Sequence, residues 1–195
     1  MKNLTIFTLA IVVSLLVSGC AVSQGNKITK TECGYKKSNG FLLVEEGDKY
    51  ECISYMKSVS YKNYNKKETD TDKTQRKKVA VFIHGGSFKD RSFIGTYFEQ
   101  AETLMKKTDI TTYRLDMPGY GQSSANNWYK MSHSKTKYNA VNEEFIKFTA
   151  SMLKEIKRNE KADELIVIGH SAGASLAATI TGTHPDLIDV AILYE

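Results

Sequence analysis

The pentapeptide Gly169-His170-Ser171-Ala172-Gly173 constrains the fold of this chain more than any other feature. It follows a predicted strand, 164–168, whose last four residues are apolar, and precedes a segment rich in alanine and other small residues. A strand that turns sharply into a helix at Gly-x-Ser-x-Gly presents the serine hydroxyl at the end of a buried sheet. Gly169 and Gly173 would let neighbouring backbone approach where a side chain would clash. The pattern predicts a nucleophilic Ser171, and the alternative is a turn that uses Gly and Ser for its shape alone.

The rest of the chain alternates between strand-like and helix-like patterns. A hairpin is predicted around residues 41–51, with its turn at Glu46-Gly47-Asp48. Continuous apolar runs, typical of strands covered on both faces, then alternate with apolar stripes at helical spacing. The predicted strands are 79–83, 110–115, 164–168 and 190–194, and the predicted helical stripes lie within 94–105, 141–156 and 174–180. This order predicts an α/β fold with a mostly parallel sheet, preceded by an antiparallel hairpin.

Three loops with suggestive residues follow three of these strands. They are residues 84–88, 116–123 and 169–173. Ligands of parallel α/β sheets bind at the carboxyl ends of the strands, so the three loops should meet at one edge. At 195 residues the chain is long enough for one domain with a substantial core.

These motifs resemble those of the α/β-hydrolase superfamily, over about residues 41–195. His84-Gly85-Gly86 resembles the oxyanion loop of lipases and esterases, and Asp116-x-Pro-Gly-x-Gly-x-Ser123 resembles a loop that shapes the turn after the fourth strand. The resemblance implies that Ser171 attacks an acyl carbonyl while the N–H groups of Gly86 and Ala172 stabilise the oxyanion.

The same resemblance assigns supporting roles around the nucleophile. It implies that His84 anchors its loop by hydrogen bonding, rather than acting as a base, and that Asp116 shapes its turn, rather than taking part in catalysis. Gly85, Gly169 and Gly173 are implied to serve the local geometry of the site. No metal or organic cofactor is implied.

The chain departs from the superfamily pattern after Ser171, where the acid and then the histidine of the triad should follow. The only candidates are His184, Asp186, Asp189 and Glu195. His184 lies beyond the helix that the serine starts, about 15 Å away, whereas a hydrogen bond reaches about 3 Å. Both aspartates precede the last strand at its amino end, which is the wrong edge. His133, in the polar loop 124–137, lies on the correct edge and is an alternative base, but a missing base is favoured over it.

We therefore expect the triad acid and base to be missing from these 195 residues. A second observation points the same way, because the apolar strand 190–194 would leave an unpaired hydrophobic edge with nothing after it. The expectation is that the chain is the N-terminal part of a larger hydrolase and lacks its last strands and helices.

The N-terminus has the features of an export signal. Lys2 precedes an apolar run, 4–17, which is shorter than the roughly 20 residues of a membrane-spanning helix. The end of this run and the residues after it, Leu16-Val17-Ser18-Gly19-Cys20, resemble the lipobox of bacterial lipoproteins. This resemblance implies that Cys20 is lipid-modified. An ordinary signal peptide, with Cys20 incidental, stays open. We expect residues 1–19 to be the signal, residues 20–40 a tether, and the protein to be exported and anchored in an envelope membrane.

Export gives the remaining cysteines a possible role. Cys33 and Cys52 are an even pair in an oxidising compartment, and they flank the predicted hairpin. A disulfide between them is plausible, provided that Cys33 lies close enough to the hairpin. The cysteines and histidines have no metal-ligand spacing.

The formal charge of +5 comes largely from residues 62–78, which mix seven basic with three acidic side chains. A solvated loop is favoured over a nucleic-acid or lipid patch, because no aromatic-interleaved motif supports the latter. The function expected is therefore a serine hydrolase of the carboxylesterase or lipase type, acting on a small acyl ester and incomplete as given. Two alternatives stay open, a serine peptidase of the same superfamily and a non-catalytic surface lipoprotein that binds without cutting.

Overall fold

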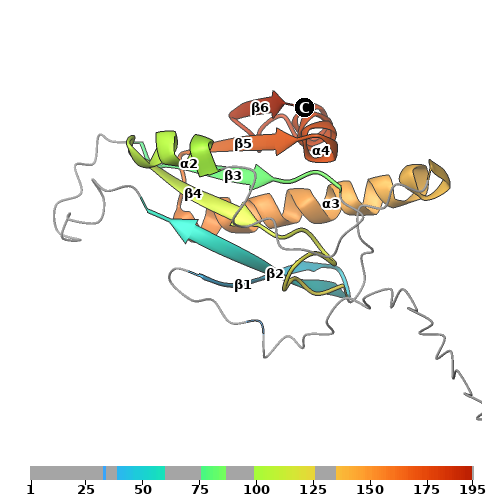
Figure 1. Ribbon diagram of the computed structural model, residues 1–195. Coiled ribbons are helices and arrows are strands. Elements are labelled where there is room, and N and C mark those ends of the chain that lie inside the picture. The colour runs from blue at the N-terminus through green and yellow to red at the C-terminus, as the bar shows by residue number, and fades with distance from the viewer. Residues whose placement is uncertain (1–32, 34–38, 60–75, 87–98, 126–134, 195) are drawn as a thin grey trace, which may run out of the picture.

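Strands and helices alternate along the chain in the order that the sequence predicts. The computed structural model describes residues 33, 39–59, 76–86, 99–125 and 135–194 (Figure 1). The predicted signal, Cys20, most of the tether, residues 87–88, His133, Glu195 and most of the charged stretch 62–78 lie outside the described residues.

The described residues form a six-stranded sheet in the order β1-β2-β4-β3-β5-β6. The strands are β1 (Asn39–Glu46), β2 (Lys49–Ser58), β3 (Lys78–Ile83), β4 (Ile110–Leu115), β5 (Glu164–His170) and β6 (Val190–Tyr194). The pairs β1–β2 and β2–β4 are antiparallel, whereas β4–β3, β3–β5 and β5–β6 are parallel. The predicted fold, a mostly parallel sheet with an N-terminal antiparallel hairpin, is confirmed.

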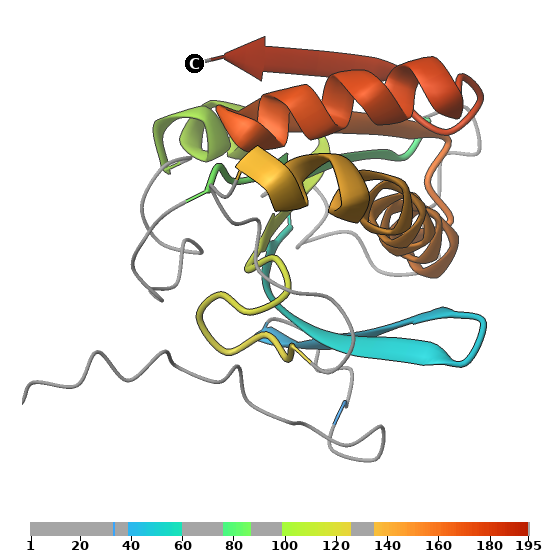
Figure 2. The same ribbon diagram turned by 90° about the vertical axis from the view of Figure 1, so that its right-hand side faces the viewer.

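Helices cover both faces of the parallel strands. The described helices are α2 (Glu99–Lys106), α3 (Lys135–Glu160) and α4 (Ala172–Thr183). Helices α3 and α4 pack on one face, as Figure 2 makes visible, and contribute Phe148, Met152 and Ile180 to the larger core. Helix α2 packs on the opposite face, where Ala101 and Met105 contact a smaller core that includes Phe82. The alternation of side chains along β3 supplies both cores, because successive residues point to opposite faces.

Two strands extend beyond the residues that the sequence pattern marks. β2 continues from the hairpin turn to Ser58, because its second half pairs with β4. This pairing connects the hairpin to the rest of the sheet. β5 includes Gly169 and His170, which pair with Leu193 and Tyr194 of β6. The motif therefore begins inside the strand, and the turn itself is confined to Ser171.

As the sequence predicts, the apolar strand 190–194 leaves a hydrophobic edge on the described sheet. β6 pairs with β5 on one side and forms the edge of the described sheet. Val190, Ile192 and Leu193 are 41%, 43% and 46% exposed. An apolar sequence shows that a strand is suited to burial. How exposed the strand is depends on which elements pack against it. None of the described helices is long and apolar enough to cross a membrane.

A buried ion cluster joins α3 to the sheet. The Glu160 carboxylate, 3% exposed, lies 2.5 Å from Lys57 Nζ and 3.0 Å from Lys77 Nζ, and it accepts a 2.5 Å hydrogen bond from the Tyr113 hydroxyl. Burial alone would raise the pKa of Glu160, but Lys57, Tyr113 and Lys77 together lower it. The carboxylate is therefore held charged beneath the sheet, where an unpaired partner would be costly.

Replacing Glu160 with Gln should lower the free energy of unfolding by about 3 kcal/mol, because it leaves the Lys57 ammonium buried without its counter-charge. Glu155→Gln is the matched control on the same helix. Its partner Arg158 is 74% exposed, so loss of that pair should change the free energy of unfolding far less. Urea denaturation at pH 7 measures both, and equal losses would contradict the assigned role of the cluster.

Candidate active site

Ser171 occupies a strained turn between β5 and α4. Its backbone angles are φ 52° and ψ −121°, a conformation that costs a non-glycine residue about 1–3 kcal/mol. The side chain is exposed and its hydroxyl makes no capping hydrogen bond to α4. A serine that served only as a helix cap would accept such a bond. The hydroxyl is instead presented to solvent at the carboxyl end of the sheet.

Neighbouring backbone groups hold this strained turn in place. The Ser171 N–H donates to the Tyr194 carbonyl oxygen of β6 at 3.0 Å. The Ser171 carbonyl oxygen accepts from the N–H groups of Ala174 (2.9 Å) and Ser175 (3.2 Å) in the first turn of α4. The His170 ring also packs against the Tyr194 ring, with 5.3 Å between centroids. Both the strand and the helix therefore fix the backbone on either side of the hydroxyl.

The glycines of the motif lie where backbone approaches backbone. A Cβ atom on Gly169 would lie 2.5 Å from the Gly173 carbonyl oxygen, and one on Gly173 would lie 2.3 Å from the Ile83 carbonyl oxygen. Real Cβ atoms essentially never come this close to another heavy atom. The start of α4 thus packs directly on the end of β3, and this spacing is possible only without side chains.

Gly85 brings the loop after β3 against the serine. A Cβ atom on Gly85 would lie 2.9 Å from Ser171 Cβ and 3.3 Å from Ser171 Oγ. Gly86 follows it and is half-buried. The structure therefore brings together two of the three predicted loops, 84–86 and 169–173. The assignment of the Gly86 and Ala172 N–H groups as oxyanion donors stays a prediction.

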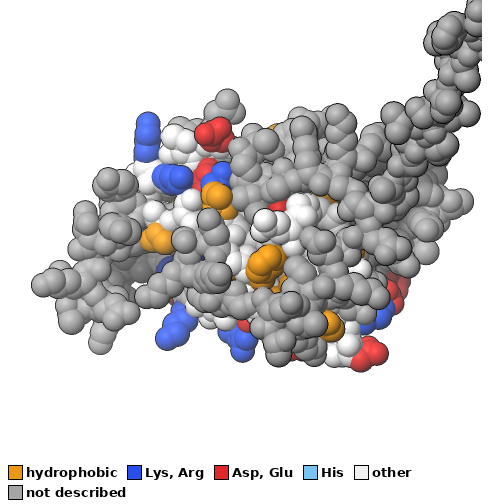
Figure 3. All heavy atoms as spheres, turned by 60° about the horizontal axis from the view of Figure 1, so that its bottom comes forward, with side chains coloured by type: hydrophobic (Ala, Val, Ile, Leu, Met, Phe, Trp, Pro, Cys, Tyr) orange, Lys and Arg blue, Asp and Glu red, His pale blue; other side chains and the backbone are white. Residues whose placement is uncertain are grey.

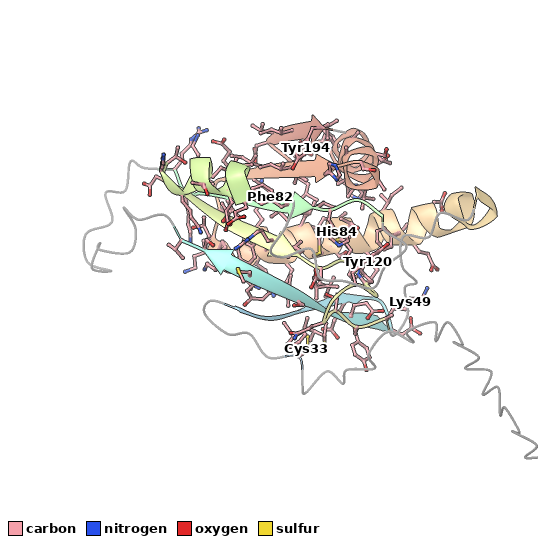
Figure 4. All side chains as sticks on the ribbon, viewed as in Figure 1. Cys33, Lys49, Phe82, His84, Tyr120 and Tyr194 are labelled. Carbon is pink, nitrogen blue, oxygen red and sulfur yellow. The ribbon has the colours of Figure 1, made fainter. Side chains whose placement is uncertain are left out.

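His84 anchors this loop to the next one. Its Nε2 accepts the Met117 N–H at 3.0 Å, and its Nδ1–H donates to the Gly85 carbonyl oxygen at 2.6 Å. The ring also meets Tyr120 edge-on, with 4.8 Å between centroids (Figure 4). Burial lowers the pKa of His84 to about 4, although the bond to Gly85 acts against that shift. At neutral pH the imidazole is uncharged and both nitrogens are engaged, which suits an anchor and not a base.

The third loop is fixed to β2. The Ser123 hydroxyl donates to the Asp116 carbonyl oxygen at 2.5 Å and accepts the Ser54 N–H at 2.8 Å. The Ser124 hydroxyl accepts the Cys52 N–H at 2.9 Å. Sequence reasoning selected Asp116 and Ser123 as part of a turn, but it missed Tyr120 and Ser124 as contacts. Their position could have indicated these contacts, because Tyr120 lies in the same glycine-containing loop and Ser124 directly follows it. Gly119 and Gly121 of this loop have φ values of 78° and 51°.

The candidate triad partners that the structure describes lie away from the serine. His184 caps the far end of the 12-residue helix α4, about 18 Å along its axis. The Asp189 carboxylate accepts from the Leu165 N–H (2.7 Å) and from Lys157 Nζ (3.1 Å), at the amino end of β5. Asp186 is exposed near the same end. In the described part of the chain, no group of three or more His, Cys, Asp or Glu side chains is placed to hold a metal ion.

Replacing Gly173 with Ala should lower the free energy of unfolding by roughly 1–3 kcal/mol, because the methyl group collides with the β3 backbone. Gly182→Ala in the same helix is the matched control, since a Cβ atom there meets nothing within 4 Å. That control should gain up to about 1 kcal/mol from helix propensity. Urea denaturation compares the two, and a gain for both variants would contradict the close approach of α4 to β3.

Because His84 is buried, we expect the free energy of unfolding to depend on pH. Its pKa of about 4 in the folded state lies below the ordinary 6.5, so the unfolded chain binds more protons between these values. The stability it contributes is complete above pH 6.5 and is lost as the pH falls toward 4, in total on the order of 3 kcal/mol. Unfolding free energies of the wild type and His84→Gln, measured from pH 7.5 to 4, isolate this effect by their difference. A difference that does not change with pH would contradict it.

Similar proteins were found both by family and by structure. The family described as serine aminopeptidase, S33, matches residues 74–194. No curated protein gave a significant sequence match. A structure described as a probable hydrolytic enzyme from Pseudomonas aeruginosa is similar with a TM-score of 0.53 and 16% identity, over 82% of this chain and 42% of that one. An esterase from Pyrococcus furiosus is similar with a TM-score of 0.51 and 16% identity, over 86% of this chain and 54% of that one.

Both structures are longer than this chain, which spans about half of their length or less. At such identities they establish the fold and leave the chemistry open. The family match covers more than half of the chain and includes all three loops of the site. With its sheet order, its strained serine turn and this match, the chain belongs to the serine aminopeptidase S33 family of the α/β hydrolases.

Proposed function

We propose that Ser171 is the nucleophile of a serine hydrolase of the carboxylesterase or lipase type, acting on small acyl esters. The observation that carries this proposal is the strained, exposed Ser171 turn lying directly against Gly85. Strain of this kind persists where the surrounding structure holds it, and it clusters at active sites. The superfamily membership of the chain gives the same turn a chemical role.

In the proposed reaction, Ser171 Oγ attacks the acyl carbonyl carbon, and the carbonyl oxygen becomes an oxyanion. The Ala172 N–H belongs to the first turn of α4, where amides have no partner inside the helix. That amide and the Gly86 N–H are the proposed donors, and the positive end of the helix dipole adds to their effect. His84 takes no proton in this scheme and holds the loop that carries Gly86.

The acid and the base are proposed to come from a segment outside these 195 residues. Two observations support this. His184 and Asp189 lie at the amino end of the sheet, far from the serine. The chain also covers only 42% and 54% of the hydrolase and esterase structures it resembles. For the complete protein we further propose export through residues 1–19 and a lipid anchor at Cys20 in an envelope membrane, on sequence grounds alone.

A second candidate is cleavage of short peptides from their amino end. The observation that favours it is the matched family, which is described as a serine aminopeptidase. The nucleophile and oxyanion donors would be the same, and only the leaving group would change from an alcohol to an amine. A third outcome, a surface lipoprotein that binds without cutting, would leave Ser171 unreactive.

The test uses the protein read from the gene with any coding sequence that continues past Glu195. A fluorophosphonate probe should label it at Ser171, and it should hydrolyse p-nitrophenyl acyl esters. Ser171→Ala should abolish both reactions. The chain of 195 residues alone should turn over about 10⁶-fold more slowly than the complete protein, because the serine lacks its general base.

Ser175→Ala is the matched control, since Ser175 is exposed one helical turn from Ser171. It should retain labelling and hydrolysis. Faster cleavage of aminoacyl p-nitroanilides than of p-nitrophenyl esters would favour the peptidase. Labelling and turnover that survive Ser171→Ala would refute the nucleophile, and a complete protein without either reaction would support the binding lipoprotein.

A further inference from the structure

Cys33 and Cys52 lie next to each other beside the N-terminal hairpin. In the sheet, β4 and β3 separate this hairpin from β5, the strand that leads to Ser171. The Cys33 thiol is in hydrogen-bond contact with the Cys52 side chain, and the two sulfurs are not bonded to each other in the structure. Cys52 lies on β2, opposite Leu43 of β1, and Figure 4 places Cys33 just below the hairpin. The distance that sequence reasoning left open is therefore short.

The side chain of Cys52 is covered although it points away from the main core. Ile53 and Tyr55 of β2 belong to the core, so Cys52, on the alternate position, faces the other side of the hairpin. A face turned away from the core is ordinarily open to solvent in an antiparallel pair. Cys52 is nevertheless 0% exposed, and Cys33 is one of the residues that pack against it.

We propose that Cys33 and Cys52 form a structural disulfide that ties the N-terminal part of the chain to the outer face of the hairpin. Oxidation requires an acceptor, which we take to be the disulfide of a thiol oxidant such as glutathione disulfide. The two cysteine thiols lose two protons and two electrons and form one S–S bond, while the oxidant disulfide gains them and leaves as two thiols. The new bond closes a loop of 20 residues, from 33 to 52.

The surroundings of the pair favour a structural bond over a reactive thiol. Burial raises the pKa of Cys33, and the contact with Cys52 and the nearby carboxylates of Glu45 and Glu51 raise it further. Reactive and metal-binding cysteines instead lie in surroundings that lower the pKa. Because these surroundings disfavour the Cys33 thiolate that reduction would produce, the disulfide once formed should resist reduction.

Closing a loop of this length in the unfolded chain stabilises a protein by restricting the unfolded state. For a chain of this size the expected difference is a Tm about 6–12 °C higher in the oxidised than in the reduced protein. The stabilisation would act on β1 and on β2, whose Ser54 and Cys52 carbonyl oxygens accept the Asp116 and Ser124 N–H groups of the loop 116–124. This inference does not depend on the reaction proposed for Ser171.

The test uses the full chain with Cys20→Ser, so that Cys33 and Cys52 are the only thiols. After equilibration with glutathione disulfide, N-ethylmaleimide in denaturant should modify neither cysteine, and both should react after reduction. Peptide mapping under non-reducing conditions should recover a peptide that joins residue 33 to residue 52. Adding a phosphine reductant should lower the Tm by the stated amount.

Cys33→Ser is the control, because it keeps the buried Cys52 and removes the ability to form the bond. Its Tm should not respond to the reductant. Modification of both thiols after oxidation would overturn the proposal, as would recovery of separate glutathione adducts in place of the joined peptide. An equal effect of the reductant on the Tm of the Cys33→Ser variant would overturn it as well.

Discussion

The close contact between the start of α4 and the end of β3 is the constraint on which the site depends. Gly173 lies so near the Ile83 carbonyl oxygen that no side chain fits between them. This contact places the first turn of α4 directly against the sheet. The chain must therefore turn from β5 into α4 at one residue, Ser171, which adopts an unusual backbone conformation. The strain at Ser171 is thus a consequence of helix–sheet packing. The exposure of the hydroxyl follows from the direction in which that one residue leaves the strand.

From this point the site is linked to its surroundings by close backbone contacts and by hydrogen bonds of the His84, Ser123 and Ser124 side chains. Gly85 lies against Ser171, and His84 links the loop that contains Gly85 to the Met117 N–H in the next loop. Ser123 and Ser124 connect that loop to β2. A neutral, buried imidazole suits such a chain of contacts, because a charged ring there would need a counter-charge. A buried ion cluster lies elsewhere, at Glu160. The face viewed in Figure 3 has both basic and acidic side chains.

The strand order and the serine turn were predictable from sequence because both depend on local patterns. Apolar runs mark β3 and β5, and two glycines flanking a serine mark a turn without room for side chains. Contacts between distant residues were not predictable in this way. The hydrogen bond from the Met117 N–H to His84 and the one from the Cys52 N–H to the Ser124 hydroxyl join residues separated by 33 and 72 positions. No periodicity reports such pairs, which arise only when the sheet is assembled. The exposure of β6 likewise depends on what packs beside the strand.

β6 couples the position of the nucleophile to the edge of the sheet. The Tyr194 carbonyl oxygen accepts the Ser171 N–H, so the last residue of this strand helps to hold the strained turn. The same strand exposes Val190, Ile192 and Leu193 and has a hydrogen-bonded neighbour on one side only within the described residues. Edge strands with few buried apolar contacts open at a lower free energy than central ones. Any element that pairs with β6 and covers those three side chains would therefore stabilise the conformation of Ser171 as well, without contacting the serine itself.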